Sequence, residues 1–244
     1  MRVILSPSTA EAVDTVALMF WEMIQSHPAS VMGLATGKTM EPVYARLAKF
    51  KTEKPLNLSK SFFFMLDEYM GLPLEHPSSF RSYIKKHVQN PLSLHDEQFA
   101  YPPVHAQNLV MAASEYERAI HEAGGIDLQL LGIGRNGHIG FNEPGSAGDS
   151  RTRIVSLTET TMLANGKEFT AGEMPSSAFS MGIGSIKDAK ALVMLATGES
   201  KADTIKYLFN HHDDESCPAT FLKSHPNFTL VLDPEAASKV NLKI

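Results

Sequence analysis

The 244-residue sequence lacks the features that mark several classes of protein. Its single cysteine, Cys217, has no partner in the chain for a disulfide, so we expect a small buried apolar side chain there. The longest unbroken apolar runs, 16–21 and 191–196, are far shorter than the about 20 residues of a membrane-spanning helix. The apolar residues 3–5 are too few for a signal peptide. These absences predict a soluble protein of the reducing cytoplasm with no membrane partner.

The chain also lacks an excess of positive charge. Lys and Arg number 22 against 27 Asp and Glu, which gives a net charge of −5. Proteins that bind nucleic acid non-specifically usually carry a basic excess, so we expect no nucleic-acid partner. The 16 glycines and 14 prolines are too few for collagen or low-complexity disorder. An anionic small molecule is compatible with this charge if helix N-termini and a few lysines bind it.

Short apolar runs alternate with amphipathic stretches along the whole chain. We predict buried strands at 2–5, 31–34, 62–66, 128–133, 189–196 and 228–232. We predict helices at 8–24, where Ser8 and Glu11 form a capping box, at 42–47, at 114–123 before two glycines, and at 200–209. Apolar strands separated by helices are typical of an α/β protein with a parallel sheet covered on both faces.

Polar or glycine-rich segments follow three of these strands, at 35–39, 67–69 and 132–138. In open parallel sheets, ligands bind beyond the carboxyl ends of the strands. We therefore expect these three segments to form one active site.

The segment Thr36-Gly37-Lys38-Thr39 lies between a predicted strand and a predicted helix. A glycine there lets backbone N–H groups approach an anion, and a helix N-terminus favours negative charge. It is not a Walker A loop, because Gly33 lies one residue too close to Gly37. The segment fits a phosphate site, and it fits equally well a plain strand-to-helix turn with a threonine cap.

Residues 132–137 have the glycine spacing of a dinucleotide-binding loop, but they do not open a helix. They continue into 138–145, whose glycines and proline predict a loop, and this argues against a nicotinamide or flavin cofactor. His138 and Glu143 in this loop fit a general acid–base pair. A histidine hydrogen-bonded within a structural loop is the alternative.

Asp67 and Glu68 directly follow the predicted strand 62–66. A carboxylate at a strand end can act as a general base when it is partly removed from water. A solvated acidic turn is the alternative. No metal site is indicated, because His211 and His212 lie beside the acidic residues 213–215 in what fits a solvated turn.

Two long motifs resemble those of one known family. Residues 66–69 (Leu-Asp-Glu-Tyr), with Gly-Leu at 71–72 and His-Pro at 76–77, resemble the signature of glucosamine-6-phosphate deaminases, and residues 132–144 resemble a second signature of that family. The motifs stand in the right order, and the resemblance covers essentially the whole chain.

The resemblance implies a single Rossmann-like domain over 1–244, an open parallel sheet with a mobile lid at about 153–181. It implies no cofactor and no metal. It also implies conversion of glucosamine 6-phosphate and water to fructose 6-phosphate and ammonia.

Matched position by position, the resemblance implies a role for each site residue. Asp67 is the base that moves a proton between C2 and C1. His138, supported by Asn136 and Glu143, transfers protons when the sugar ring opens. The residues that hold the phosphate are Thr36, Gly37, Lys38, Thr39, Lys167 and Lys201.

The sequence departs from the family at several positions. Asn136 stands where some members have aspartate, so Glu143 alone would offset an imidazolium charge. Lys167 stands where arginine is common, which removes bidentate phosphate recognition. Val155 replaces the lysine of allosterically regulated members, and the sequence ends at Ile244 without their longer C-terminal segment. We therefore expect no activation by an acetylated amino-sugar phosphate, and the oligomeric state stays open.

Three other functions were weighed against the deaminase. A 6-phosphogluconolactonase has the same fold but is not expected to carry the motif that begins at Asp67. A non-enzymatic sugar-phosphate sensor is expected to have lost the base and to carry a DNA-binding module, whereas Asp67, His138 and Glu143 are all present. A nicotinamide-dependent dehydrogenase needs a helix directly after Gly137.

Overall fold

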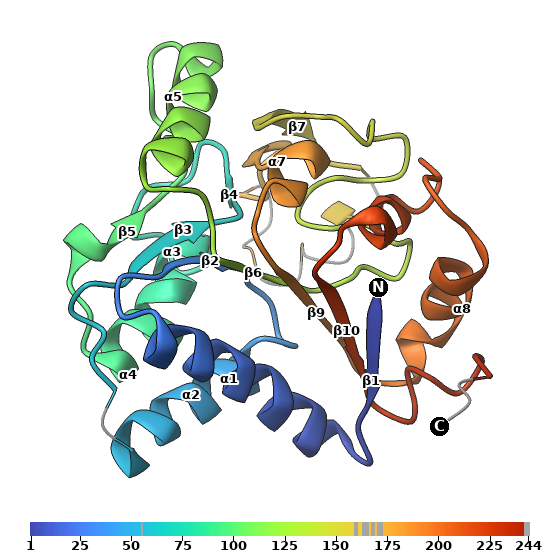
Figure 1. Cartoon of the computed structure of the whole chain (residues 1–244). Coiled ribbons are helices and arrows are strands. Elements are labelled where there is room, and N and C mark those ends of the chain that lie inside the picture. The colour runs from blue at the N-terminus through green and yellow to red at the C-terminus, as the bar shows by residue number, and fades with distance from the viewer. Residues whose placement is uncertain (55, 159–160, 163–165, 167–168, 170–172, 242–244) are drawn as a thin grey trace.

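A seven-stranded parallel sheet and a three-stranded antiparallel sheet form the β-structure of the computed structural model (Figure 1). The structure describes residues 1–54, 56–158, 161–162, 166, 169 and 173–241. The strands of the parallel sheet are, in spatial order, β1 (Arg2–Leu5), β10 (Phe228–Leu232), β9 (Leu192–Ala196), β6 (Leu128–Leu131), β2 (Val31–Leu34), β3 (Phe62–Met65) and β5 (Phe99–Ala100). β2, β9 and β10 are buried along their whole length, which explains their nearly unbroken apolar sequences.

Helices cover both faces of the parallel sheet. They are α1 (Thr9–Ser26), α2 (Glu41–Glu53), α3 (Phe80–Ile84) with a π-helical continuation (Lys85–Gln89), α4 (Asn90–Leu92), α5 (Leu109–Glu122), α7 (Ile183–Lys187) and α8 (Ala202–Asn210). In Figure 1, α1 and α2 lie below the sheet, and α5 and α7 lie above it. α1 begins where the Ser8 side chain accepts a hydrogen bond from the Glu11 N–H at 3.2 Å, as its sequence predicts.

The direction of winding reverses between β2 and β6, which are neighbours in the centre of the sheet. After β2 the chain continues to β3 on one side, and after β6 it continues to β9 on the other. Because these strands are parallel, the segments that follow β2, β3 and β6 leave from the same edge of the sheet. Doubly wound sheets bind ligands in the crevice at such a reversal.

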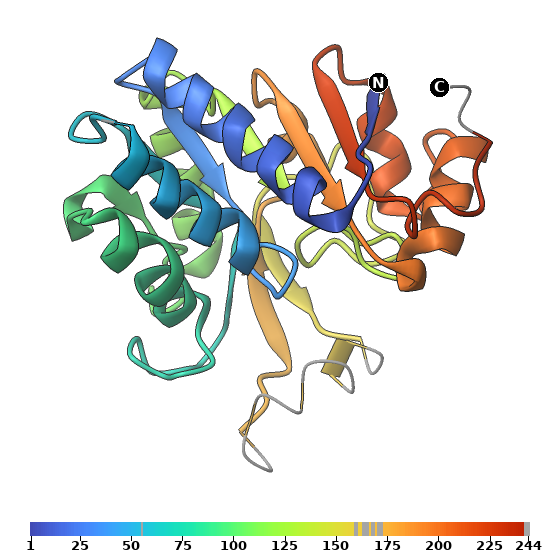
Figure 2. The same ribbon diagram turned by 90° about the horizontal axis from the view of Figure 1, so that it is seen from below.

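The antiparallel sheet begins immediately after β3. Leu66 joins β3 to β4 (Asp67–Tyr69), and β4 pairs with β8 (Ser177–Ser180), which pairs with β7 (Arg153–Ser156). We call the described residues of 153–181 the β7–β8 arm, and Figure 2 shows its two strands extending away from the main body. The arm packs around a small hydrophobic cluster that is separate from the main core and consists of Tyr69, Leu72, Phe141, Leu157 and Ala178.

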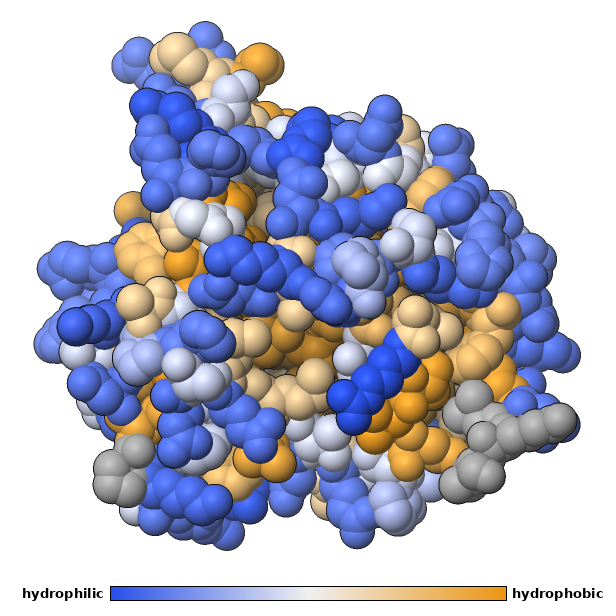
Figure 3. Space-filling model, in the orientation of Figure 1, coloured by the Kyte–Doolittle hydropathy of each residue, from blue (hydrophilic) through white to orange (hydrophobic). Residues whose placement is uncertain are grey.

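The predicted α/β class, the six predicted strands and their parallel pairing are confirmed. The prediction for α5 was wrong at its start, since the helix begins at Leu109, where the Asn108 side chain accepts a hydrogen bond from the Met111 N–H. Val110 and Met111 are 78% and 56% exposed, so they break the amphipathic pattern, and apolar surface is visible at the tip of α5 in Figure 3.

Other boundaries differ by a few residues. The segment predicted as the start of a helix at 200 instead forms a 3₁₀ turn, Glu199–Lys201, before α8. The antiparallel sheet was not predicted. Among the described residues, no helix combines the length and apolarity needed to cross a membrane.

Candidate active site

The reversal point brings two of the predicted site segments together. Met40 ends the loop after β2, and Gly132 begins the loop after β6. A Cβ placed on Gly132 would lie 3.5 Å from Met40 Cε, so the Met40 side chain lies close to Gly132. The loop at 35–40 and the loop at 132–143 are therefore neighbours at the reversal point.

The loop after β6 holds a chain of three polar side chains. His138 Nδ1 lies 2.7 Å from Asn136 Oδ1, and Asn136 Nδ2 lies 2.7 Å from Glu143 Oε2. The ionised carboxylate can only accept hydrogen bonds, so the amide must turn its NH₂ group toward Glu143 and its oxygen toward the imidazole. His138 Nδ1–H then donates to Asn136, which leaves Nε2 as the nitrogen with a free lone pair.

Two glycines of this loop are required by close packing. A Cβ on Gly134 would lie 2.3 Å from the His138 ring, and one on Gly137 would lie 2.2 Å from Cys217 Sγ. Gly137 also has a φ of +83°, which strongly favours glycine. The glycine spacing that mimics a dinucleotide motif thus serves to seat His138 against the backbone, and the segment forms a loop as predicted.

The electrostatic environment of His138 is mixed. Burial lowers the pKa of His138, Glu143 raises it, and Lys201 lowers it further. The Nδ1 atom lies 3.6 Å from Glu143 Oε1, and the side chain of His138 is 34% exposed against 9% for Glu143. The imidazole is thus accessible from outside while its supporting carboxylate is buried.

Asp67 lies against the same loop from the neighbouring strand. Its side chain is 5% exposed, and a Cβ on Gly140, where φ is +57°, would lie 3.2 Å from Asp67 Oδ2. Burial raises the pKa of Asp67, and the nearby Glu68 raises it further. A buried carboxylate of raised pKa that packs against the His138 loop is a candidate for a functional base.

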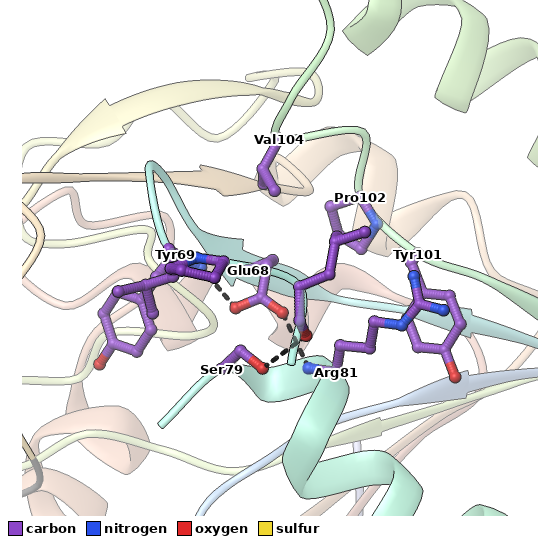
Figure 4. A pocket seen from close by; sticks show the side chains of 10 residues that line it. Glu68, Tyr69, Ser79, Arg81, Tyr101, Pro102 and Val104 are labelled. Atoms are coloured by element: carbon purple, nitrogen blue, oxygen red, sulfur yellow. Dashed lines mark hydrogen bonds between the residues drawn. The ribbon is translucent and has the colours of Figure 1, made fainter. Parts of the chain in front are cut away.

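Glu68 has a structural role, which the sequence did not reveal. Its carboxylate accepts hydrogen bonds from the N–H groups of Tyr69 at 2.8 Å, Phe80 at 2.9 Å and Arg81 at 2.8 Å. The last two belong to the first turn of α3, so Glu68 caps that helix (Figure 4). Glu68 also lines a small hollow of about 10 Å³ in the same view. Because successive residues of a strand point to opposite faces, its neighbour Asp67 on β4 points away from this hollow.

The loop after β2 is held by two tyrosines. The Tyr44 hydroxyl donates to Ala35 O at 2.6 Å, and the Tyr83 hydroxyl donates to Gly37 O at 2.8 Å. Gly37 has a φ of +102°, which turns the chain toward α2. Within the predicted phosphate segment, Gly37 and Lys38 are exposed and Thr36 and Thr39 are partly exposed. Tyr83 was not predicted as a site residue, because nothing in its local sequence distinguishes it from a core aromatic.

Two cationic side chains lie at the start of α8, on the other side of the His138 loop. Lys201 occupies the N-cap position, and the Thr204 hydroxyl donates to the backbone oxygen of Arg135. Burial lowers the pKa of Lys201, and the nearby Arg135 lowers it further. The structure thus places Lys201 near His138 and Asp67 near Gly140, around the same loop. Lys167, also predicted to hold the phosphate, lies outside the described residues.

The fold and this site define a class of protein. A doubly wound parallel sheet carries, near its reversal point, a histidine hydrogen-bonded through an amide to a glutamate, a buried aspartate and a glycine turn before a helix, and the described loop after β6 does not open a helix. The chain matches the family described as glucosamine-6-phosphate isomerases/6-phosphogluconolactonase over residues 7–231, and it belongs to that family.

Individual relatives resemble the chain over nearly its whole length. It is 45% identical over 233 residues to a glucosamine-6-phosphate deaminase of Rhodopirellula baltica, covering 95% of this chain and 93% of the relative. It is 42% identical to the deaminase of Shewanella woodyi, covering 99% and 92%. A solved monomeric glucosamine-6-phosphate deaminase superposes with a TM-score of 0.94 at 35% identity, covering 98% of this chain and 100% of that one. The 6-phosphogluconolactonase of Trypanosoma brucei, at 19% identity and a TM-score of 0.77, shares the fold.

Proposed function

We propose that this chain is a glucosamine-6-phosphate deaminase, which converts glucosamine 6-phosphate and water to fructose 6-phosphate and ammonia. The observation that carries the proposal is the position of buried Asp67 against Gly140, in the same loop that holds the His138–Asn136–Glu143 chain. The names of the relatives at 42–45% identity support the same activity.

His138 opens the sugar ring in the proposed mechanism. Its Nε2 lone pair takes the proton of the C1 hydroxyl, and the resulting imidazolium gives a proton to the ring oxygen, so that the pyranose becomes an open-chain aldehyde. This shuttle needs a group whose pKa is close to neutrality, which suits a histidine. Asn136 holds the ring in the tautomer that leaves Nε2 free.

Asp67 then carries out the isomerisation. The ionised carboxylate removes the proton from C2, which the neighbouring aldehyde acidifies, while the C1 oxygen gains a proton from the C2 ammonium group. The Asp67 carboxyl then gives its proton to C1 of the resulting enolamine. The product has a C=N bond at C2, which water hydrolyses to the ketone with release of ammonia. The raised pKa of Asp67 suits this role, because it makes the carboxylate a stronger base toward the C2 proton. The free-energy costs of taking up that proton and of returning it are then similar. The net reaction breaks a C–N bond with water, and its central step is an aldose–ketose isomerisation.

The phosphate binds at the far end of the crevice from the reacting carbons. Thr36, Gly37, Lys38 and Thr39 offer backbone and side-chain donors at the N-terminus of α2, and Lys201 supplies a cation. We assign Lys167 to the same site from the sequence alone. Binding energy from the phosphate fixes C1 and C2 against Asp67 and His138.

An assay of the purified chain tests this function. We expect release of ammonia and fructose 6-phosphate in equal amounts from glucosamine 6-phosphate, with no added nucleotide. Glucosamine without the phosphate should react at least ~100-fold more slowly in kcat/KM, because the remote binding energy is lost. Hydrolysis of 6-phosphogluconolactone without ammonia release from the amino sugar would instead assign the lactonase activity.

A further inference from the structure

The Glu143 carboxylate receives hydrogen bonds from two different parts of the chain. Oε2 accepts from Asn136 Nδ2 at 2.7 Å, within the loop after β6. Oε1 accepts from the hydroxyl of Thr161, which lies 18 residues further on in the β7–β8 arm. Glu143 and Thr161 are 7% and 6% exposed, so this bond is shielded from water. Thr161 was not among the predicted site residues.

Local structure holds Thr161 in place. The Thr158 hydroxyl accepts from the Thr161 N–H at 3.2 Å and donates to the Thr161 hydroxyl oxygen at 3.2 Å. The Met162 N–H bonds to Thr158 O at 2.9 Å, and the Leu157 N–H bonds to Ser176 O on the chain leading into β8 at 2.9 Å. Thr161 is therefore presented to Glu143 by a hydrogen-bonded turn that is itself anchored to the arm.

The oxygen that Thr161 binds is the one that faces the histidine. Glu143 Oε1 lies 3.6 Å from His138 Nδ1, whereas Oε2 is engaged by Asn136. The Thr161 hydroxyl, as a hydrogen-bond donor to Oε1, occupies lone pairs that would otherwise interact with a His138 imidazolium. The amount of negative charge that reaches His138 therefore depends on a residue of the arm.

We propose that Thr161 is a positioning residue for Glu143, whose hydroxyl fixes the carboxylate and limits its effect on the charge state of His138. The catalytic part of this inference rests on the proposed function, in which His138 moves protons during ring opening. The electrostatic part, the dependence of His138 on Thr161, holds for any substrate.

The charged groups around His138 determine how a substitution at Thr161 affects the protonation of the imidazole. Glu143 favours the imidazolium, and Lys201 opposes it from the start of α8. Asp67 lies across Gly140, and Arg135 lies beside Lys201. With the Thr161 hydroxyl removed and these groups unchanged, Glu143 Oε1 has one donor fewer and is free to interact with Nδ1–H. The imidazolium is then favoured, so His138 stays protonated to a higher pH.

The test compares Thr161→Val, which keeps the shape and removes the hydroxyl, with Thr161→Ser, which keeps the hydroxyl. Ser156→Ala, at an exposed position of β7, is the matched control within the arm. The first measurement is the NMR titration of the His138 imidazole, assigned with His138→Gln, and it needs no substrate. We expect an upward shift of ~0.5 pH unit in Thr161→Val and no shift in the other two variants.

The second measurement is the pH–rate profile for ammonia release. We expect kcat of Thr161→Val to fall ~3–10-fold with little change in KM, and its acidic limb to move upward with the NMR value. If the parent releases no ammonia, the proposed function fails while the NMR titration still decides the role of Thr161. A Thr161→Val titration that overlays the parent, or a Thr161→Ser variant as altered as Thr161→Val, would overturn the inference.

Discussion

Asp67 is an ionisable residue in a buried position, and this burial affects both its pKa and the stability of the protein. Burial and the neighbouring Glu68 raise the pKa of its carboxyl above the value in the unfolded chain. The stabilising contribution of such a group is fully present only below the unfolded pKa, and it is lost as the pH rises through the folded pKa. At neutral pH the ionised carboxylate therefore lowers the free energy of unfolding.

We predict that Asp67→Asn loses activity and gains stability. The rate of ammonia release should fall ~10²–10⁴-fold, because the general base is gone. The melting temperature at pH 7 should rise by a few degrees, about 2–4 °C for each kcal/mol relieved in a protein of this size. The gain should vanish below about pH 4, where the unfolded carboxylate is also protonated.

Asp203→Asn, at a carboxylate that is 81% exposed, provides the control. It should change neither the rate of ammonia release nor the melting temperature. Thermal melts from pH 4 to pH 8 and the ammonia assay check both halves of this prediction. A melting temperature of Asp67→Asn that equals the parent's at every pH would show that the carboxylate is not strained by burial.

Asn136 sets the balance of charge around His138. Its amide donates to Glu143 and its oxygen accepts from the imidazole, so it links the two groups without adding charge. We predict that Asn136→Asp shifts the acidic limb of the pH–rate profile upward, because a second carboxylate favours the imidazolium and raises the pKa of His138.

The same substitution replaces a donor with an acceptor 2.7 Å from Glu143 Oε2. Two carboxylates at that distance cannot both ionise without repulsion, so they should share a proton and lower the melting temperature most at alkaline pH. A pH–rate profile that matches the parent, measured on folded protein, would contradict the electrostatic role assigned to Asn136.

At the scale of elements, Glu68 links β4, the strand that carries Asp67, to a helix. It accepts N–H bonds from Phe80 and Arg81 in the first turn of α3 and from Tyr69 on its own strand. α3 in turn carries Tyr83, whose hydroxyl holds the loop at Gly37. One carboxylate next to the base thus supports the loop that we assign to phosphate binding.

We predict that Glu68→Gln destabilises the protein by ~1–2 kcal/mol, the usual cost of losing an N-terminal cap. KM for glucosamine 6-phosphate should rise more than kcat falls, because the loop at Gly37 loses support through α3. Glu75→Gln, at a glutamate 70% exposed in the preceding loop, is the control. Equal melting temperatures for the two variants would contradict the capping role.

The elements also show how much of the fold could be predicted from the sequence. The buried strands were predictable, because a strand covered on both faces needs an apolar residue at nearly every position. The loop at 132–145 was predictable as a loop, since its glycines and proline disfavour a helix. The second sheet was not predictable, because β4 is too short for a periodic signal and pairs with β8 over a hundred residues later.

The site residues also divide into those that the sequence could predict and those that it could not. Asp67, His138 and the loop at 36–39 follow strand ends, so the topology of a parallel sheet brings them together. Glu68 and Thr161 could not be assigned, because their roles depend on contacts across the fold and not on local spacing. The roles given to Asn136 and Lys201 came from the family resemblance, whereas Glu143 was also paired with His138 from the sequence itself. The effect of all three residues on catalysis stays a prediction.

The whole molecule contains two hydrophobic units of very different size. The main core spans the parallel sheet and its helices, whereas the β7–β8 arm packs on the small cluster around Tyr69 and Phe141. β7 is an edge strand and is only partly buried, and β9 is buried at all five positions. Because local stability follows buried apolar contacts, the arm should open without unfolding of the main sheet.

We predict that the backbone amides of β7 exchange with solvent at least ~100-fold faster than those of β9 under native conditions.

The arm also contacts the loop after β6. Phe141 belongs to the cluster of the arm, and Thr161 bonds to Glu143, so the arm and this loop form one contact network. A ligand that occupies the crevice should therefore slow exchange in β7 and leave β9 unchanged. Hydrogen-exchange mass spectrometry with and without fructose 6-phosphate measures both effects, and inorganic sulfate at the same concentration controls for ionic strength. Equal protection of β7 and β9 in the free protein would show that the arm is a fixed part of the core and would remove the basis for treating 153–181 as a mobile lid.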